Sequence, residues 1–406
     1  MKIVVLKFGG TSVGNIKRIK NVAEIISSYS KKNYKVIAVT SAMAGVTNDL
    51  VKKSEEISDN FSHAEYDVLV SSGEQVACSL IAARLIHKGL KSRSWLSWQI
   101  PIITLGSYKN SRINKINKNN ILKYLKSGGI PIISGFQGIN FEGRITTIGR
   151  GGSDASAIML AKFFKAEKCV IYTDVDGVYT TDPNKLKKAK KIKIISYEEM
   201  LEMASLGAKV MQPVSIQDAR LNRIDIEVRS SFIKKPGTLI TKRSNIIDKR
   251  IVTGISSTQN DSKITLIGVK DKPGVAASIF KPLSKNSINV DMVVQNISAN
   301  GKETDLTFTI KTEDLNKTKK IIKLNKSIKF RKLILKKDVS KISVIGVGMV
   351  TTPGVTFRMF QTLANKKINI QVISTSEIKI SVLIDKRNTK KALIALHKEF
   401  KLDTKK

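Results

Sequence analysis

The chain has 406 residues and a formal net charge of +38, from 71 lysines and arginines against 33 acidic residues. Its length predicts two or three domains of about 150 residues each, and a hydrophobic content of 41% is ordinary for a folded soluble protein. Two cysteines, Cys78 and Cys169, argue against a disulfide framework and favour the reducing cytoplasm. We expect no membrane span, which needs about 20 apolar residues, and no secretory signal, because residues 1–7 run directly into a motif.

The positive charge admits a nucleic-acid or membrane partner, but its distribution argues against both. The lysines are spread over the whole chain, and the densest runs, 185–193 and 317–337, lack a regular interleaving of aromatic side chains for base stacking. We therefore expect a lysine-rich composition with no nucleic-acid and no membrane partner. A positive field would still attract ATP and dicarboxylate substrates.

Strand and helix patterns alternate over the first half of the chain. Short apolar runs predict strands at 2–7, 36–39, 100–105, 130–134, 170–173 and 224–229. Apolar residues at three- and four-residue spacing predict helices at 16–29, 68–86, 154–164, 196–203 and 215–221. Continuous apolar strands between helices indicate a mainly parallel sheet that is covered on both faces.

An internal repeat follows a polar stretch at 243–250 that we interpret as a linker. Residues 263–269 match 341–347, and the Pro-Gly-Val sequence at 273–275 recurs at 353–355. Each copy has a strand, a Pro-Gly turn, a helix and a strand, then an alternating strand (304–310 or 378–384) and a final helix. This order predicts two ferredoxin-like βαββαβ units. The fold alone implies no ligand.

The segment Lys7–Ser12 stands where a strand gives way to a helix. Gly9 and Gly10 would let backbone N–H groups approach a phosphate, with the positive end of a helix behind them. Lys7 would add a point charge for the transferring phosphoryl group. The segment is not a P-loop, which needs a lysine after its second glycine. Taken alone, it also fits a plain tight turn.

Three glycines surround Arg150 in the segment Gly149–Asp154, which opens a predicted helix. Ser153 or Asp154 could cap that helix, which is a sufficient structural reason for either residue. Capping does not explain an arginine among glycines. Such an arginine can form a bidentate pair with a substrate carboxylate.

Residues 173–183 follow a strand, where open parallel sheets bind their ligands. Asp176 and Gly177 are typical of a turn, whereas Asp174 and Asp182 are better candidates for nucleotide contacts. Glu74, taken alone, fits an ordinary exposed helix residue.

The three histidines, His63, His87 and His397, are scattered along the chain. They form no metal-ligand cluster and no catalytic triad. We therefore expect no metal site built by the protein alone, and any metal is expected to be Mg²⁺ brought by ATP.

Together these motifs resemble the aspartate kinase family over nearly the whole chain. The matching segments are 7–12 (KFGGTS), 41–43 (SAM), 72–74 (SGE), 135–138 (GFQG), 147–154 (TIGRGGSD), 172–179 (YTDVDGVY), 207–210 (GAKV) and 228–231 (VRSS). The repeat resembles a pair of ACT domains, with 289–296 (NVDMVVQN) and 374–378 (STSEI) as matching segments. The ACT pair and the RGGSD string favour aspartate over the substrates of related kinases, which are glutamate, acetylglutamate, carbamate and UMP.

The resemblance implies an α/β chain: a three-layer αβα amino-acid-kinase fold over 1–242, then the linker at 243–250. The first ACT domain would span 262–337, and the second would combine 251–261 with 338–406. The expected co-substrates are ATP and Mg²⁺. The expected reaction converts L-aspartate to 4-phospho-L-aspartate, the first step toward lysine, threonine, methionine and diaminopimelate.

The resemblance also assigns residues to roles. The catalytic set is Lys7, Asp154 and Lys209. The nucleotide set is Lys7, Phe8, Gly9, Gly10, Thr173, Asp174, Tyr179, Thr180, Asp182, Pro183, Lys185 and Lys209, with Lys185 standing in for an arginine that the family often has at the position of Asn184. The aspartate set is Thr47, Glu74, Arg150, Gly151, Gly152 and Ser153. The effector set is Asp271, Ala276, Asn289, Val290, Asp291 and Gln295 in the first copy, with Thr356, Asn369, Ile370, Ser376 and Glu377 in the second.

In the family, ACT pairs bind lysine, threonine or both and inhibit the kinase, and they pair across chains, so a homo-oligomer is expected. Two other hypotheses remain at this point. One is another amino-acid kinase, such as a glutamate 5-kinase, and the other is a non-catalytic basic binding protein. The latter is expected to lack Lys7, Arg150 or Asp174, and all three are present.

Overall fold

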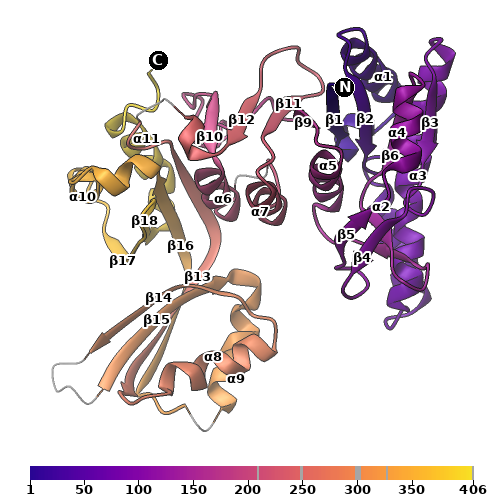
Figure 1. Ribbon diagram of the computed structural model, residues 1–406. Coiled ribbons are helices and arrows are strands. Elements are labelled where there is room, and N and C mark those ends of the chain that lie inside the picture. Colours follow the sequence, from indigo (N-terminus) through magenta and orange to yellow (C-terminus); the bar gives the residue numbers. More distant parts are fainter. Residues whose placement is uncertain (208–209, 247–249, 298–302, 326–327, 405–406) are drawn as a thin grey trace. The chain divides into compact units, whose positions relative to one another are not determined.

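The computed structural model describes residues 1–207, 210–246, 250–297, 303–325 and 328–404, which form two compact units (Figure 1). The first unit contains Met1–Val178 and Lys191–Asp248, and the second contains Tyr179–Lys190 and Lys249–Lys406. The segment Tyr179–Lys190 is therefore part of the second unit by its contacts, although the proposed boundary at residue 242 places it in the first.

An eight-stranded sheet forms the centre of the first unit, in the order β10-β12-β11-β9-β1-β2-β6-β3. Its strands are β1 (Ile3–Phe8), β2 (Lys35–Thr40), β3 (Ser92–Trp95), β6 (Ile130–Ser134), β9 (Lys168–Thr173), β10 (Ile194–Ser196), β11 (Ile226–Ser230) and β12 (Thr238–Thr241). Neighbouring strands are parallel except β11 and β12. The predicted mainly parallel sheet is confirmed.

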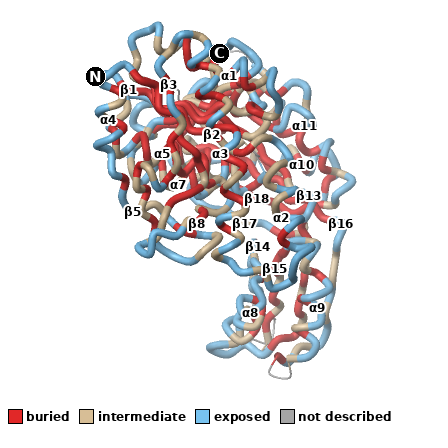
Figure 2. Tube along the Cα trace, turned by 90° about the vertical axis from the view of Figure 1, so that its right-hand side faces the viewer, coloured by how far each residue is buried: buried red, intermediate tan, exposed pale blue. Residues whose placement is uncertain are grey.

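Helices cover both faces of this sheet and give it three layers. The helices of this unit are α1 (Ile16–Ser30), α2 (Val46–Ile57), α3 (His63–His87), α4 (Asn119–Lys126), α5 (Gly152–Phe163), α6 (Tyr197–Ser205) and α7 (Pro213–Asn222). Of these, α2 packs mainly on α3, and α7 packs mainly on α5 and α6. The alternation along β1 separates the layers: Val4, Leu6 and Phe8 pack in one core cluster with α1 and α3, and Lys7 points to the face that α5 covers. Figure 2 shows the buried residues concentrated in these strands and their covering helices.

A separate four-stranded sheet lies in the same unit. It contains β4 (Ile102–Leu105), β5 (Arg112–Ile116), β7 (Gln137–Ile139) and β8 (Ile145–Thr147), in the order β5-β4-β7-β8. The strand expected at 100–105 in the parallel sheet is β4 of this second sheet instead. The local apolar pattern identified the strand but not its partners.

By length and composition, α3 is long and apolar enough to cross a membrane, which we did not expect from the sequence. Half of its most apolar window is buried inside the unit. Ala77, Ile81 and Leu85 of α3 pack in the core cluster beneath the large sheet. These contacts are those of a core helix.

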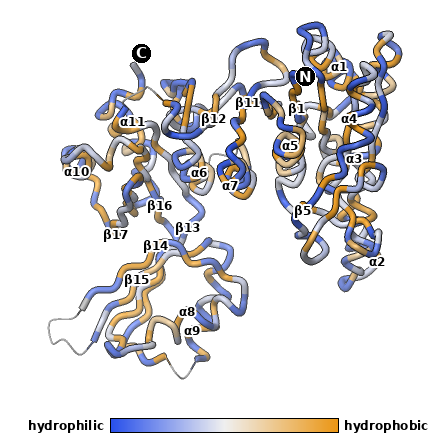
Figure 3. The backbone as a smooth tube through the Cα atoms, in the orientation of Figure 1, coloured by the Kyte–Doolittle hydropathy of each residue, from blue (hydrophilic) through white to orange (hydrophobic). Residues whose placement is uncertain are grey.

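One six-stranded antiparallel sheet joins the two repeats of the second unit, in the order β14-β15-β13-β16-β18-β17. Its strands are β13 (Gly254–Lys270), β14 (Val290–Ile297), β15 (Glu303–Lys311), β16 (Lys332–Ile345), β17 (Ile370–Thr375) and β18 (Lys379–Asp385). Its helices are α8 (Val275–Lys285), α9 (Leu315–Leu324), α10 (Val355–Asn365) and α11 (Thr389–Glu399). Hydrophobic and hydrophilic residues alternate along these strands (Figure 3), as in a sheet covered on one face.

The long strands β13 and β16 each serve both repeats. Gly254–Thr258 pairs with Lys341–Ile345 beside the second repeat, and Asp261–Ile267 pairs with the earlier half of β16 beside the first. The register shifts between Thr258 and Asp261, where one half gives way to the other. Each repeat keeps its own hydrophobic core, and Met292, Val339, Val372 and Leu383 form a third cluster from both repeats.

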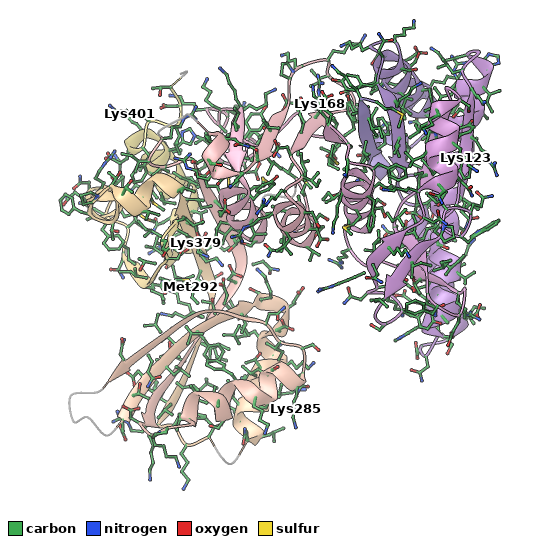
Figure 4. All side chains as sticks on the ribbon, in the orientation of Figure 1. Lys123, Lys168, Lys285, Met292, Lys379 and Lys401 are labelled. Carbon is green, nitrogen blue, oxygen red and sulfur yellow. The ribbon has the colours of Figure 1, made fainter. Side chains whose placement is uncertain are left out.

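The lysines are dispersed over both units. Figure 4 labels Lys123 and Lys168 on the first unit, and Lys285, Lys379 and Lys401 on the second. This dispersal agrees with the composition-based interpretation of the +38 charge.

Thr180 connects the segment Tyr179–Lys190 to α11 through a hydrogen bond with His397. It is fully buried, its Oγ1 lies 2.9 Å from Nε2 of His397, and it accepts a hydrogen bond from the backbone N–H of Lys190 at 3.0 Å. Since Oγ1 already accepts from Lys190, the hydroxyl can donate to a neutral imidazole. Burial lowers the pKa of His397, the charge of Lys190 lowers it further, and Asp403 opposes both.

We expect His397 to make the second unit acid-sensitive. The unfolded imidazole titrates near 6.5, and the folded one titrates lower, so acid favours unfolding as the pH falls below about 6.5. Calorimetry at pH 7.5 and 5.5 should show a larger loss of thermal stability in the wild type than in His397→Gln. The exposed His87 supplies the control, since His87→Gln should behave as the wild type. Equal acid losses in the wild type and His397→Gln would contradict this role.

Candidate active site

Lys7 and Asp154 form a buried ion pair at the carboxyl edge of the large sheet. Lys7 lies one residue before the end of β1, and Asp154 lies in the first turn of α5. Nζ of Lys7 is 2.6 Å from Oδ1 of Asp154, and each side chain is 10% exposed. An ammonium group has three donors, so Asp154 can orient Lys7 while leaving donors free for a phosphate.

The glycines after Lys7 are held close to the neighbouring strand. Gly9 donates its N–H to the carbonyl of Tyr172 at 3.1 Å, and Gly10 begins a short 3₁₀ turn, Gly10–Val13. Helix α1 begins at Ile16, as predicted, so the helical N-terminus next to the glycine pair is that of the 3₁₀ turn. The expectation for Phe8 is corrected: its side chain is buried and stacks on Tyr172 with ring centroids 5.0 Å apart. Only its backbone remains for a nucleotide.

We expect Gly10→Ala to be more destabilising than Gly9→Ala. A Cβ at Gly10 would lie 2.9 Å from the carbonyl oxygen of Ala42, whereas one at Gly9 would meet its nearest atoms at 3.5 Å. Overpacking of this kind costs about 1–3 kcal/mol. Denaturant unfolding of both variants measures the difference in the free energy of unfolding. Equal values would show that the backbone at Ala42 can shift at no cost to make room for the added Cβ.

Glu74 lies inside α3 and is 3% exposed. Its Oε1 accepts the backbone N–H of Ala42 at 3.0 Å, while its Oε2 is buried without a hydrogen-bond partner. Burial raises the pKa of Glu74 to about 7, against the opposing effects of the Ala42 N–H and the charge of Lys7. An unpaired buried carboxylate oxygen costs free energy unless a ligand satisfies it. The interpretation of Glu74 as an ordinary exposed residue is therefore excluded.

The loop before α5 depends on two left-handed glycines. Gly149 has φ +76° and Gly151 has φ +77°, a region that favours glycine. Gly151 is the N-cap of α5 and no side chain caps the helix, so Ser153 and Asp154 are not caps. Arg150, between the two glycines, is exposed.

A cavity of about 660 Å³ joins these elements. From the sequence-based sets it is lined by Lys7, Gly10, Thr47, Glu74, Arg150, Gly151, Gly152, Ser153 and Asp154. Its other lining residues include Tyr66 and Lys109, which sequence reasoning missed, and Met43 and Thr147, which lie in the matched segments 41–43 and 147–154 but were assigned no role. The structure thus brings the whole aspartate set together with Lys7 and Asp154, at the strand ends where parallel sheets bind ligands.

The nucleotide set is divided between the two units. Thr173 ends β9 and its hydroxyl donates to the exposed Asp174 at 3.1 Å, in the first unit but outside the 660 Å³ cavity. Tyr179, Thr180, Asp182, Pro183 and Lys185 belong to the second unit. Lys209 lies outside the described residues.

Two members of that set already have partners in the second unit. The hydroxyl of Thr180 is buried against His397, as described above. Nζ of Lys185 donates to the carbonyl and the hydroxyl of Ser257 at 2.9 and 3.0 Å. Thr180 is fully buried, so its hydroxyl is closed to a phosphate in this conformation. Lys185 is exposed, and its ammonium has a third donor beside the two that Ser257 accepts, so its assignment to the nucleotide set stays a prediction.

The effector sets lie at corresponding places of the two repeats. Val290, Asp291 and Gln295 are on β14, and Ile370 is on β17, the two edge strands of the six-stranded sheet. Asp271 and Gln295 are in weak contact at 3.5 Å. Asp291 pairs with the buried Lys341 of the second repeat. Ala276, Asn289, Thr356, Asn369, Ser376 and Glu377 are exposed.

Within the described residues, no group of three or more His, Cys, Asp or Glu side chains could hold a metal ion. A second cavity, of about 710 Å³, lies between α1 and the strands β9 and β11. It contains none of the residues that the sequence assigned to a site.

Comparisons with known proteins agree with this arrangement. The amino acid kinase family matches residues 2–230, and the ACT domain matches residues 264–324 and 342–400. An aspartate kinase from Stutzerimonas stutzeri is 42% identical over 405 residues, covering 99% of this chain and 98% of that protein. An aspartokinase from Pseudomonas aeruginosa is 43% identical over 406 residues, with the same coverage.

A solved structure gives the same result. The crystal structure of E. coli aspartokinase III in complex with aspartate and ADP is similar, with a TM-score of 0.79, at 25% identity, covering 98% of this chain and 99% of that one. The fold, the cavity and these relatives agree, and we conclude that the chain belongs to the aspartate kinase family, with an amino acid kinase domain followed by ACT domains.

Proposed function

We propose that the 660 Å³ cavity binds L-aspartate for phosphorylation of its side-chain carboxylate. The observation that carries this is the charge pattern of the cavity: the exposed Arg150, the buried Lys7 and the unsatisfied Oε2 of Glu74. L-aspartate carries two carboxylates and one ammonium. Glu74 would bind the ammonium, Arg150 would bind the carboxylate that does not react, and Lys7 would lie beside the transferring phosphoryl group.

The chemistry needs no general base. A carboxylate with a pKa of about 3.9 is already ionised at neutral pH, so it can attack the γ-phosphorus directly while ADP leaves with the electron pair. The difficulty is repulsion between two anions. Lys7, oriented by Asp154, would offset that repulsion as charge develops.

ATP would enter from the strand edge at Thr173 and Asp174, next to Lys7 on the neighbouring strand. Mg²⁺ would come bound to the ATP phosphates, because Mg²⁺ uses one or two carboxylates together with substrate phosphates. Asp174 is exposed at this edge and is a suitable carboxylate.

The ACT repeats would bind lysine, threonine or both and inhibit the kinase, through the effector residues on β14 and β17. Support comes from a relative: the T-state structure of E. coli aspartokinase III contains lysine and aspartate.

We further propose that the chain forms a homo-oligomer through the ACT domains. We also propose a cytoplasmic location, in keeping with two free buried cysteines. The product would enter the synthesis of lysine, threonine and methionine.

One assay tests the proposal. Hydroxylamine traps the acyl phosphate formed from ATP–Mg²⁺ and aspartate, and the assay is repeated with glutamate and with added lysine or threonine. We expect aspartyl hydroxamate, little glutamyl hydroxamate, and inhibition by at least one of the two amino acids. The absence of aspartyl hydroxamate under every condition would refute the site assignment, and a glutamyl product would favour a glutamate 5-kinase-like activity.

A further inference from the structure

Asp67 of α3 is a buried carboxylate with no role in the chemistry above. It is fully buried, and no cation pairs with it among the described residues. Its oxygens accept the backbone N–H of Lys109 at 3.0 and 3.1 Å, the backbone N–H of Thr147 at 2.8 Å and the hydroxyl of Thr147 at 2.7 Å. Burying a charge is costly unless it is hydrogen-bonded, and here three donors satisfy it.

These bonds join two segments at one wall of the cavity. Thr147 ends β8, and the chain continues directly into Gly149 and Arg150. The turn with Lys109 packs against the same place, because a Cβ on Gly149 would lie 3.2 Å from the carbonyl oxygen of Lys109. Asp67 therefore fixes the turn and the Arg150 loop relative to each other.

The backbone of Lys109 is in a left-handed conformation, which is unfavourable for a residue with a side chain. Its φ is +67°, in the left-handed region that a lysine rarely occupies. Such strain persists where the surroundings hold it, and it is concentrated at functional sites. The Asp67 carboxylate supplies that constraint by accepting the Lys109 N–H.

Lys109 lines the cavity together with Arg150. Its Nζ lies 4.0 Å from the centre of the Tyr66 ring, which limits its direction through a cation–π contact. Among the described residues, neither Lys109 nor Arg150 has an acidic partner within ion-pair distance. Two unneutralised cations at one wall fit an anionic group of the ligand.

We propose that Lys109 binds, beside Arg150, the substrate carboxylate that does not react, and that Asp67 is the positioning residue that holds Lys109 there. The inference rests on the proposed assignment of this cavity to L-aspartate. Lys109 would thus help to select a substrate with a carboxylate at this place. Asp67 would position the Lys109 backbone without touching the substrate.

The test compares L-aspartate with its α-amide, L-isoasparagine, which keeps the reacting carboxylate and lacks the other charge. Lys109→Met keeps the apolar stem and removes the charge. We expect it to lower kcat/KM for aspartate by about tenfold or more, with the KM for ATP unchanged, and to have little effect on the α-amide. Lys109→Arg should restore most of the activity. If the amide is not turned over, its Ki against aspartate gives the same comparison.

Equal losses for aspartate and its α-amide would overturn the role of Lys109. The exposed Lys115 of β5 gives a matched control, since Lys115→Met should change neither. Asp67→Asn should raise the KM for aspartate, and this effect should be smaller in the Lys109→Met background, because part of it acts through the position of Lys109 and the rest through the Arg150 loop. Full additivity would show that Asp67 does not act through Lys109. A wild type that forms no aspartyl hydroxamate refutes the cavity assignment instead, so the two failures are distinguishable.

Discussion

Lys7→Ala should lower kcat by at least about a hundredfold, in the range expected when a group that stabilises transition-state charge is removed. The structure gives two reasons. Lys7 points from β1 toward α5 at the strand edge, and Asp154 holds its ammonium 2.6 Å away, so its position is fixed before the phosphoryl group arrives. The acceptor and the phosphate are both anions, so the loss falls on the chemical step. The hydroxamate assay under saturating ATP and aspartate measures it.

The same change leaves Asp154 buried without its cation. Breaking such a pair costs about 3–5 kcal/mol, so we expect a protein that is less stable but still folded at the assay temperature. Denaturant unfolding must accompany the kinetics for this reason. Lys20→Ala, at an exposed position of α1 in the same unit, is the matched control and should change neither quantity. Near-normal turnover in Lys7→Ala would refute the role given to Lys7.

Strong, continuous apolar patterns predicted the central elements well. β6 was placed at its observed bounds and α3 within a few residues, because both carry long buried stretches. Helix α2 was missed: Ser54 is its one buried residue, and four of its residues are apolar, Val46, Leu50, Val51 and Ile57. The four-stranded sheet was missed as a sheet because β7 and β8 have three residues each, too few to give a periodic signal.

The site could be predicted in part. Glycine spacing and an arginine among glycines indicated the cavity wall. The resemblance put Lys7 and Asp154 in one catalytic set, but no local pattern predicted that they form an ion pair, because they lie 147 positions apart. Asp67 was missed because its partners, Lys109 and Thr147, lie 42 and 80 residues away. The packing of Tyr179–Lys190 with the second unit was likewise not predicted, because its partners there lie far along the chain, as His397 does for Thr180.

Glu74 should make aspartate use depend on pH. Only the ionised carboxylate can hold the substrate ammonium, and burial raises its pKa to about 7. We therefore expect kcat/KM for aspartate to rise about tenfold per pH unit below pH 7 and to level off above it, since this parameter follows the free enzyme. Glu74→Gln should remove this inflection and lower kcat/KM by about tenfold or more, because a neutral amide binds an ammonium weakly. Glu65→Gln, at an exposed position of the same helix, should keep the wild-type profile.

As the pH rises, the free energy of unfolding should fall while kcat/KM rises. This contrast distinguishes a functional carboxylate from a structural one. The folded pKa of Glu74, about 7, lies above its ordinary value of 4.5, so between these values the folded protein holds a proton that the unfolded chain releases. Stability therefore falls as the pH rises through this window and stays lower above it. Glu74→Gln escapes this cost and keeps an acceptor for the Ala42 N–H, so at pH 8 it should be more stable by about 1–3 kcal/mol. A variant that is less stable at pH 8 with unchanged kcat/KM would show that Glu74 serves the core. A more stable and less active one would show that the protein keeps a costly buried charge for its substrate.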